Sequence, residues 1–293
     1  DLAGGARTDR LKIIVFDDDP TGSQTVHGCP LLLRWDRDTL RRALAHPSPL
    51  LFLLTDSRAL PPEQARTRIL ELCRALRPAL AEGLAAGWFG RWLVVSRGDS
   101  TLRGHFPLET DAVAAELGPF DATLLVPAFL PGGRATGGGV HRLHGEPVHT
   151  TPFARDRLFA YTSSFLPAWV AEKTAGRIAA EQVERIDRAE LEAAAASADG
   201  AAALRRRLAG FAANVCVAVD GERPRQRAAL AAAVGDLTDP AAAGPWGRPR
   251  RFLFQSAASL IDALAALPPQ PLDAAGLAAL RRRGAAGPWP GLV

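Results

Sequence analysis

Methionine is absent from the sequence, cysteine and lysine are scarce, and no long hydrophobic run occurs. A translated chain begins with methionine, so either the start has been trimmed or modified methionines are not represented. No run of about eighteen apolar residues is present, and we therefore expect no membrane-spanning helix. Residues 1–10 are polar and lack the apolar segment of a secretory signal. These absences favour a globular protein without membrane contact.

The three cysteines, Cys29, Cys73 and Cys216, lie far apart and show no CxxC spacing. That spacing is typical of metal sites and redox motifs, so its absence argues against both. Each cysteine lies in an apolar stretch, and we expect all three to be small buried residues in a reducing compartment. This indicates the cytoplasm.

Positive charge comes almost entirely from arginine, because Lys12 and Lys173 are the only lysines. Runs of three arginines occur at 205–207 and 281–283, both in segments rich in Ala and Leu. A nucleic-acid-binding surface would place basic residues with interleaved aromatic ones on one face. Since the formal net charge is only +4, we interpret these runs as solvated helix faces and expect no nucleic-acid partner.

Short apolar runs alternate with longer amphipathic ones along the chain, a pattern typical of a mostly parallel sheet covered by helices. The sequence therefore predicts an α/β fold, a Rossmann-like three-layer sandwich with helices on both faces of the sheet. Strands are expected near residues 11–16, 30–35, 50–55, 92–96, 123–126, 215–219 and 251–254. Helices are expected near 37–45, 62–81, 104–117, 165–173, 189–209, 225–234 and 257–266.

Two segments depart from this alternation. Residues 128–152 are rich in Pro, Gly, Arg, His and Thr and show no periodicity; loops of this length inside compact domains are usually functional. Towards the carboxyl end, prolines between 268 and 290 indicate a linker, and residues 291–293 look like the start of a strand. We therefore expect one domain over 1–286, with 287–293 beginning a second domain that is missing.

Three predicted strands run into polar residues suited to binding anions or moving protons. The first ends in Asp17, Asp18 and Asp19, and three adjacent carboxylates need cations, hydrogen bonds or solvent to compensate their repulsion. The second leads to Arg58, and the third to residues 97–105 at the start of a predicted helix. The third segment contains Arg97, Gly98, Asp99, Ser100, Arg103 and His105.

Ligands of open α/β sheets bind at the carboxyl ends of the strands. Arginine side chains and helix N-termini both favour carboxylate or phosphate oxygens. The alternative interpretation is that these residues form solvated capping turns and surface ion pairs.

The motifs at these strand ends resemble those of the four-carbon acid sugar kinases, and their order and spacing agree over essentially the whole chain. The motifs are Asp18-Asp19-Pro20-Thr21-Gly22, Ser57-Arg58, Asp99-Ser100-Thr101-Leu102-Arg103-Gly104, Val126-Pro127-Ala128-Phe129 with Gly133-Arg134, and Trp169-Val170-Ala171-Glu172-Lys173-Thr174.

The resemblance implies that this chain is the N-terminal, substrate-binding domain of a cytoplasmic kinase. Its substrate would be a small sugar acid such as erythronate, threonate or 3-oxo-tetronate, with ATP and Mg²⁺ as cofactors. Most of the ATP site would lie in the missing C-terminal domain, so we expect the fragment alone to be inactive, and a homodimer is one candidate assembly. The implied substrate-binding residues are Asp18, Asp19, Arg58, Arg97, Gly98, Asp99, Ser100, Arg103 and Arg134.

Two residues depart from the family pattern. Arg97 stands where many relatives carry lysine, and because guanidinium is a planar fork, the pose of the acid group can differ. His105 replaces a common asparagine.

A mechanism follows as a hypothesis. Arg58 and Arg97 would grip the substrate carboxylate bidentately, and Asp19, or else Asp99, would accept the proton of the attacking hydroxyl. Phosphoryl transfer needs mainly positioning and charge stabilisation, and residues 128–151 could close over the sugar.

Two other functions remain open at this point. Asp17-x-Asp19-x-Thr21 after an apolar strand also fits the nucleophile loop of a haloacid-dehalogenase-like, Mg²⁺-dependent phosphatase, although a suitably placed lysine is hard to find. A non-catalytic sugar-acid-binding module is the other alternative.

Weaker patterns favour structural roles. His141 and His144 have a His-x-x-His spacing, but no helix places both rings on one face, so we assign no metal site. The five glycines of 131–139 lack the order of a P-loop. Phe165 and Trp169, four residues apart, are expected to pack a helix onto the sheet, and Asp220 is expected in a turn.

Overall fold

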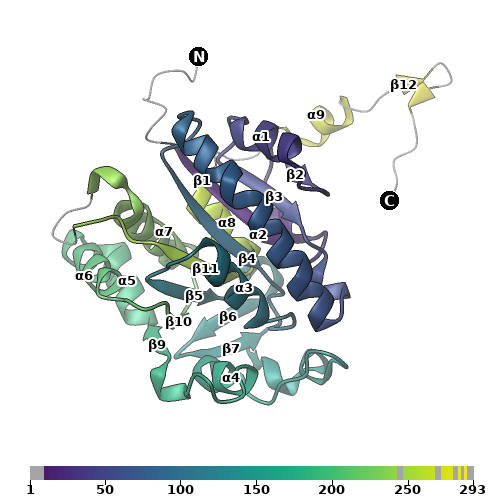
Figure 1. The fold of residues 1–293 in the computed structure, drawn as a ribbon. Coiled ribbons are helices and arrows are strands. Elements are labelled where there is room, and N and C mark those ends of the chain that lie inside the picture. The colour runs from purple at the N-terminus through teal and green to yellow at the C-terminus, as the bar shows by residue number, and fades with distance from the viewer. Residues whose placement is uncertain (1–9, 243–246, 268–271, 280–282, 285–286, 289–293) are drawn as a thin grey trace.

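The computed structural model describes residues 10–242, 247–267, 272–279, 283–284 and 287–288. Within them, eight parallel strands form one sheet in the order β2-β3-β1-β4-β11-β5-β10-β9 (Figure 1). Its strands are β1 (Leu11–Asp17), β2 (Leu31–Leu32), β3 (Leu50–Leu54), β4 (Arg91–Arg97), β5 (Ala122–Val126), β9 (Glu184–Ile186), β10 (Val215–Val219) and β11 (Phe252–Ser256).

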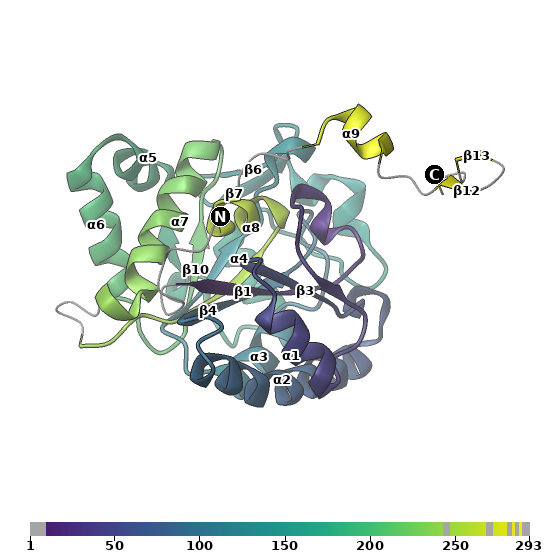
Figure 2. The ribbon, with the colours of Figure 1, turned by 90° about the horizontal axis from the view of Figure 1, so that it is seen from above.

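Helices cover both faces of this sheet, as the alternating pattern predicts (Figure 2). On one side lie α1 (Arg37–Ala45), α2 (Pro62–Ala85), α3 (Leu108–Leu117) and α4 (Leu166–Lys173). On the other lie α5 (Arg188–Ala196), α6 (Ala198–Ala209), α7 (Pro224–Thr238) and α8 (Ala258–Ala265). The predicted three-layer α/β sandwich is confirmed.

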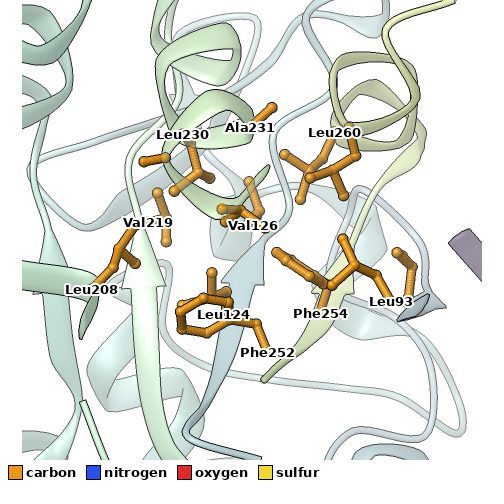
Figure 3. Packing of buried hydrophobic residues seen from close by; sticks show 14 of the residues in the cluster. Leu93, Leu124, Val126, Leu208, Val219, Leu230, Ala231, Phe252, Phe254 and Leu260 are labelled. Atoms are coloured by element: carbon orange, nitrogen blue, oxygen red, sulfur yellow. The ribbon is translucent and has the colours of Figure 1, made fainter. Parts of the chain in front are cut away.

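Strand β1 shows why the layers form. Ile13 and Val15 join the core beneath α5–α8, while Ile14 and Phe16 join the core beneath α1–α3. Successive side chains of a strand point to opposite faces, so an uninterrupted apolar run marks a strand buried on both sides. Figure 3 shows part of the first core, where Phe254 of β11 packs near Leu260 of α8.

The order of strands places a topological switch between β1 and β4. After β1 the chain forms β3 on one side of it, then returns through α2 to form β4 on the other side. The loops that follow β1 and β4 therefore diverge, and in open α/β sheets such a point opens a crevice for ligands. Asp17 and Arg97 end these two strands and are paired in register.

The prediction that residues 128–152 form an irregular loop is wrong in part. It contains a small antiparallel sheet of β6 (Arg134–Gly137), β7 (Val140–Leu143) and β8 (Glu146–Pro147). A bridge between Thr136 and Gly221 attaches this sheet to the segment after β10. Glycines at the hairpin turn interrupt the alternation on which strand prediction depends.

Several predicted boundaries also change. The single helix expected at 189–209 is two helices, because extended Ser197 ends α5 and caps α6 through a bond to the Gly200 N–H. The helix expected from residue 104 begins at Leu108. The strand expected at 30–35 is reduced to Leu31–Leu32.

Towards the carboxyl end, the structure describes α9 (Ala274–Ala279), β12 (Arg283–Gly284) and β13 (Gly287–Pro288). The predicted strand start at 291–293 lies outside the described residues, as does the position of the predicted boundary at 286. Among the described residues, no helix combines the length and the hydropathy that crossing a membrane requires.

Candidate functional site

The carboxyl ends of β1, β3, β4 and β11 surround a cleft of about 360 Å³. The three polar strand ends singled out in the sequence therefore meet in one place, as predicted. The sequence-predicted residues that line the cleft are Asp19, Arg58, Arg97, Gly98, Asp99, Ser100, Arg103 and Arg134. Asp18 lies beneath them and is 1% exposed.

Asp18 is the centre of an ion-pair network in the floor of the cleft. Arg58 donates to both Asp18 oxygens, through Nε at 2.8 Å and Nη2 at 2.6 Å, and its Nη1 lies 2.6 Å from Asp19 Oδ2. Arg97 Nη1 donates to Asp18 Oδ1 at 2.9 Å and Asp19 Oδ1 at 3.1 Å. Burial raises the pKa of Asp18 above its ordinary value, although the two arginines oppose that rise.

This network changes the role expected of Arg58 and Arg97. All three guanidinium nitrogens of Arg58 already contact carboxylates. Arg97, only 6% exposed, also places Nη2 3.2 Å from Thr21 Oγ1. Since all the guanidinium nitrogens of Arg58 and Nη1 of Arg97 contact protein acids, both arginines fix the shape of the cleft, and a carboxylate that bound Arg58 bidentately would have to displace Asp18 or Asp19.

Asp17 lies deeper still. It is fully buried, and within the described residues neither of its oxygens accepts a hydrogen bond, although Arg97 Nη1 is 3.5 Å away. Burial is the main reason that its pKa is raised to about 7. A Cβ on Gly22 would lie 1.9 Å from Asp17 Oδ1, so glycine alone fits against this carboxyl. A sealed side chain is poorly placed for the nucleophile role of the phosphatase hypothesis.

Asp19 and Asp99 are the two acids that reach the cleft. Asp19 Oδ1 is surrounded by Thr21 and Arg97, which leaves Oδ2 beside Arg58 as its more open oxygen. Asp99 Oδ2 accepts from Thr101 and from Arg103 Nε. Desolvation opposes ionisation of both acids, but these hydrogen bonds and charges hold the pKa of each below its ordinary value. Both are therefore ionised acceptors at neutral pH.

Arg103 and Arg134 supply the positive charge on the outer walls. Besides its bonds to Asp99, Arg103 stacks on the Phe153 ring at 4.9 Å and lies 3.8 Å from Asp156. Arg134, at the start of β6, donates through Nη1 to the Gly132 carbonyl, while its buried Nε has no partner within the described residues. Among the cleft's arginines, Arg134 is thus the one that no carboxylate occupies in the described structure.

The glycine-rich stretch beside Arg134 does not form a phosphate cradle. The N–H groups of Gly138 and Gly139 donate to Asp220, each at 2.9 Å, and that of Gly133 donates to Leu130. Asp220, which was expected only to lie in a turn, therefore also holds the β6–β7 turn against the end of β10. Within the described residues, no group of three or more acidic, His or Cys side chains could hold a metal ion. We therefore assign no residue here to ATP or Mg²⁺.

A buried glutamate beneath the cleft was not predicted from the sequence. Glu109 of α3, 5% exposed, accepts from Ser57 Oγ at one oxygen and from Ser96 Oγ, at 3.1 Å, at the other. Burial, with a contribution from Asp18, raises its pKa to about 7. In the sequence it resembles any acid in the first turn of a helix, so nothing in the pattern distinguishes it.

Several weaker predictions can be compared with the structure directly. Trp169 is buried and stacks on Phe106 at 4.9 Å, whereas Phe165 is 38% exposed, so one of the two packs as expected. Cys73 and Cys216 are buried, while Cys29 is half-buried. Phe129, part of a motif named above, also lines the cleft, whereas Gln24, Ala257 and Ala258 were not singled out because such residue types carry little chemical signal.

The parallel sheet, its switch point and the cleft between the strand ends define a Rossmann-like α/β domain of the kind that binds small molecules. Residues 13–264 match the family described as the sugar-binding N-terminal domain, and the chain belongs to that family. The predicted resemblance to the four-carbon acid sugar kinases is confirmed, since a D-erythronate kinase from Heliobacterium modesticaldum is 32% identical over 152 residues.

The match to that kinase covers 49% of this chain and 32% of the relative. A domain of unknown function from Bordetella bronchiseptica, solved with bound citrate as a domain-swapped dimer, aligns with a TM-score of 0.60 and 25% identity. That alignment covers 87% of this chain and 55% of that one. A Haemophilus influenzae protein of unknown function shares the fold at 18% identity and a TM-score of 0.57, with the same coverage. The chain thus spans about a third of the curated relative and just over half of these solved structures.

Proposed function

We propose that this chain binds a four-carbon sugar acid, of the erythronate, threonate or 3-oxo-tetronate type, for phosphorylation by ATP. The observation that carries the proposal is the cleft at the switch point, where four arginines and two ionised acids meet. A short polyhydroxy acid needs both kinds of group, because arginine binds its carboxylate and the acids accept from its hydroxyls. The similarity to a D-erythronate kinase supports the same substrate class.

The substrate carboxylate is assigned to Arg134, and Arg103 contributes further positive charge to the lining of the same cleft. Arg134 contributes a guanidinium that no protein acid neutralises among the described residues. Arg58 and Arg97 act indirectly in this arrangement, since they hold Asp18 and Asp19 in place. The role of binding the substrate carboxylate, expected of Arg58 and Arg97 from the sequence, is therefore proposed for Arg134 instead.

Asp19 and Asp99 are the candidate bases. Each is ionised at neutral pH and faces the cleft, so either can accept the proton of a substrate hydroxyl. Phosphoryl transfer depends chiefly on positioning and charge stabilisation, and this chain would supply the positioning of the acceptor. ATP and Mg²⁺ would be the cofactors of this transfer, with most of the ATP site expected outside this domain.

The test is isothermal titration calorimetry with D-erythronate and D-threonate, each with and without MgATP. Binding of either acid in the absence of nucleotide is expected, and failure of both acids to bind would contradict the proposal. Magnesium-dependent hydrolysis of a sugar phosphate without ATP would instead favour a phosphatase.

We also propose a cytoplasmic location, in keeping with three free cysteines, and a homodimer, since the Bordetella protein is a domain-swapped dimer.

A further inference from the structure

The turn that carries Asp99 and Ser100 into the cleft is held from outside its own segment. His141 Nε2 lies 2.8 Å from the Ser100 carbonyl, and Tyr161 Oη donates to the next carbonyl, that of Thr101, at 2.7 Å. His141 belongs to β7 and Tyr161 to the segment before α4. Two consecutive carbonyls of the turn are therefore fixed by residues that follow it by 41 and 60 positions.

The turn needs this support because its backbone is strained. Leu102 has a φ of 65°, in the left-handed region that disfavours a branched side chain. Such conformations persist only where surrounding contacts determine them. Within the turn itself, the Leu102 N–H bonds to the Asp99 carbonyl at 3.0 Å.

The hydrogen bonds fix the tautomer of His141. A carbonyl can only accept, so Nε2 carries the proton, and Nδ1 must accept from the Thr136 hydroxyl at 2.8 Å. Both Thr136 and His141 are fully buried. Desolvation lowers the pKa of His141 to about 4, so the ring stays neutral at physiological pH.

The same hairpin carries Arg134, which also lines the cleft. β6 begins at Arg134 and contains Thr136, which pairs in register with His141. A continuous path thus runs from Arg134 along β6 to Thr136, across to His141, and on to the Ser100 carbonyl beside Asp99. Arg134, Asp99 and Ser100 all line the cleft.

We propose that His141 is a positioning residue that sets the spacing between Arg134 and Asp99, two residues that line the cleft. It does so without touching the ligand, through its bond to the Ser100 carbonyl. The inference deepens the proposed function and rests on it, because this spacing would select the length of acid that can contact Arg134 and Asp99 at the same time.

Two substitutions separate this role from simple packing. The amide of glutamine extends to about the position of Nε2, whereas that of asparagine reaches only about that of Nδ1. His141→Gln can therefore keep the bond to Ser100 and lose the one to Thr136, and His141→Asn does the reverse. Each variant loses one buried hydrogen bond, so similar losses of thermal stability are expected.

Binding and backbone exchange should differ between the two variants. We expect His141→Asn to weaken D-erythronate binding by about tenfold or more, while His141→Gln stays close to the unmodified chain. Hydrogen–deuterium exchange of the amides at 98–103 should rise in His141→Asn and in Tyr161→Phe, and not in His141→Gln. This second measurement uses no ligand.

Equal binding and equal exchange in the Gln and Asn variants would overturn the inference. If the unmodified chain binds neither D-erythronate nor D-threonate, the proposed function fails, while the exchange comparison still decides whether His141 holds the turn. If the acids bind and exchange at 98–103 is the same in all variants, the role of His141 fails and the proposed function stands.

Discussion

Arg58 donates two hydrogen bonds to Asp18, at 2.8 and 2.6 Å, in a pair that joins the end of β1 to the turn after β3. The side chain of Asp18 is 2% exposed and that of Arg58 is 17% exposed. Asp18 also accepts from Arg97 at the end of β4, so one carboxylate ties three strand ends together. The floor of the cleft is therefore built from the protein's own side chains.

The first prediction concerns this pair. Asp18→Ala should lower the free energy of unfolding by about 3 kcal/mol, because it removes the buried carboxylate that Arg58 and Arg97 share and leaves both guanidinium groups with Asp19 as their remaining close acid. Urea denaturation measures the change. Asp236→Ala is the matched control, since it breaks an exposed pair with Arg205 and should change stability by less than about 1 kcal/mol. Equal losses in the two variants would contradict a floor built on Asp18.

The second prediction concerns the pH dependence of stability. With its pKa raised from 4.5 to about 7, native Glu109 keeps its proton where the unfolded chain loses it, so stability falls as pH rises from about 4.5 to 7. Glu109→Gln imitates the protonated form and escapes this loss. The variant should match the unmodified chain near pH 4.5 and exceed it by on the order of 2–3 kcal/mol at pH 8.

Urea midpoints measured across this pH range check the second prediction. Asp17, whose pKa is also about 7, titrates in both chains, so the difference between them isolates Glu109. If the difference in free energy of unfolding between the variant and the unmodified chain stayed constant from pH 4.5 to pH 8, Glu109 would be ionised throughout that range, and the prediction would be wrong.

The third prediction concerns Gly22. Its replacement by alanine would push a methyl group into the Asp17 carboxyl, which lies 1.9 Å from the position of the new Cβ. Because Asp17 is fully buried and has little room to move, we expect a loss of about 2–4 kcal/mol. Gly235→Ala in α7 is the control: its Cβ would meet no atom within 4 Å, and alanine favours helix by about 1 kcal/mol. Thermal unfolding of both variants checks the sign of each effect.

The fourth prediction concerns the carboxylate grip. Arg134→Ala should weaken D-erythronate binding by about tenfold to a hundredfold, as expected for loss of a charged hydrogen bond. Arg142→Ala is the matched control, because Arg142 lies in the same hairpin and bonds to backbone carbonyls, but lines a neighbouring hollow. Calorimetry of both variants is decisive. If both substitutions weakened D-erythronate binding equally, the effect would come from the hairpin as a whole, and Arg134 would not be the residue that binds the carboxylate.

Much of the fold could be predicted from the sequence, because apolar runs such as residues 13–16 and 50–53 report burial on both faces of a strand. The convergence of the strand ends followed from the same pattern, since parallel strands present their carboxyl ends at one edge of the sheet. Asp19, Arg58 and Asp99 were found in this way.

The pairing of side chains within the cleft could not be predicted. Whether Arg58 faces a substrate or Asp18 depends on ångström-scale distances between segments 40 residues apart, and the sequence pattern carries no such distances. Nor could the buried roles of Glu109 and His141 be predicted, because an acid in a first helical turn and a histidine in a Gly-rich stretch look like surface residues. The β6–β8 sheet was missed since its strands are short and interrupted by glycine.

The central claim is that a small sugar acid binds between Arg134 and Asp99 in the cleft at the strand ends. A crystal structure of the chain with D-erythronate tests it most directly. We predict that the acid's carboxylate lies within hydrogen-bond distance of Arg134, and that a hydroxyl lies within the same distance of Asp99 or Asp19. An acid bound elsewhere, or one whose carboxylate displaces Asp18 from Arg58, would contradict the account.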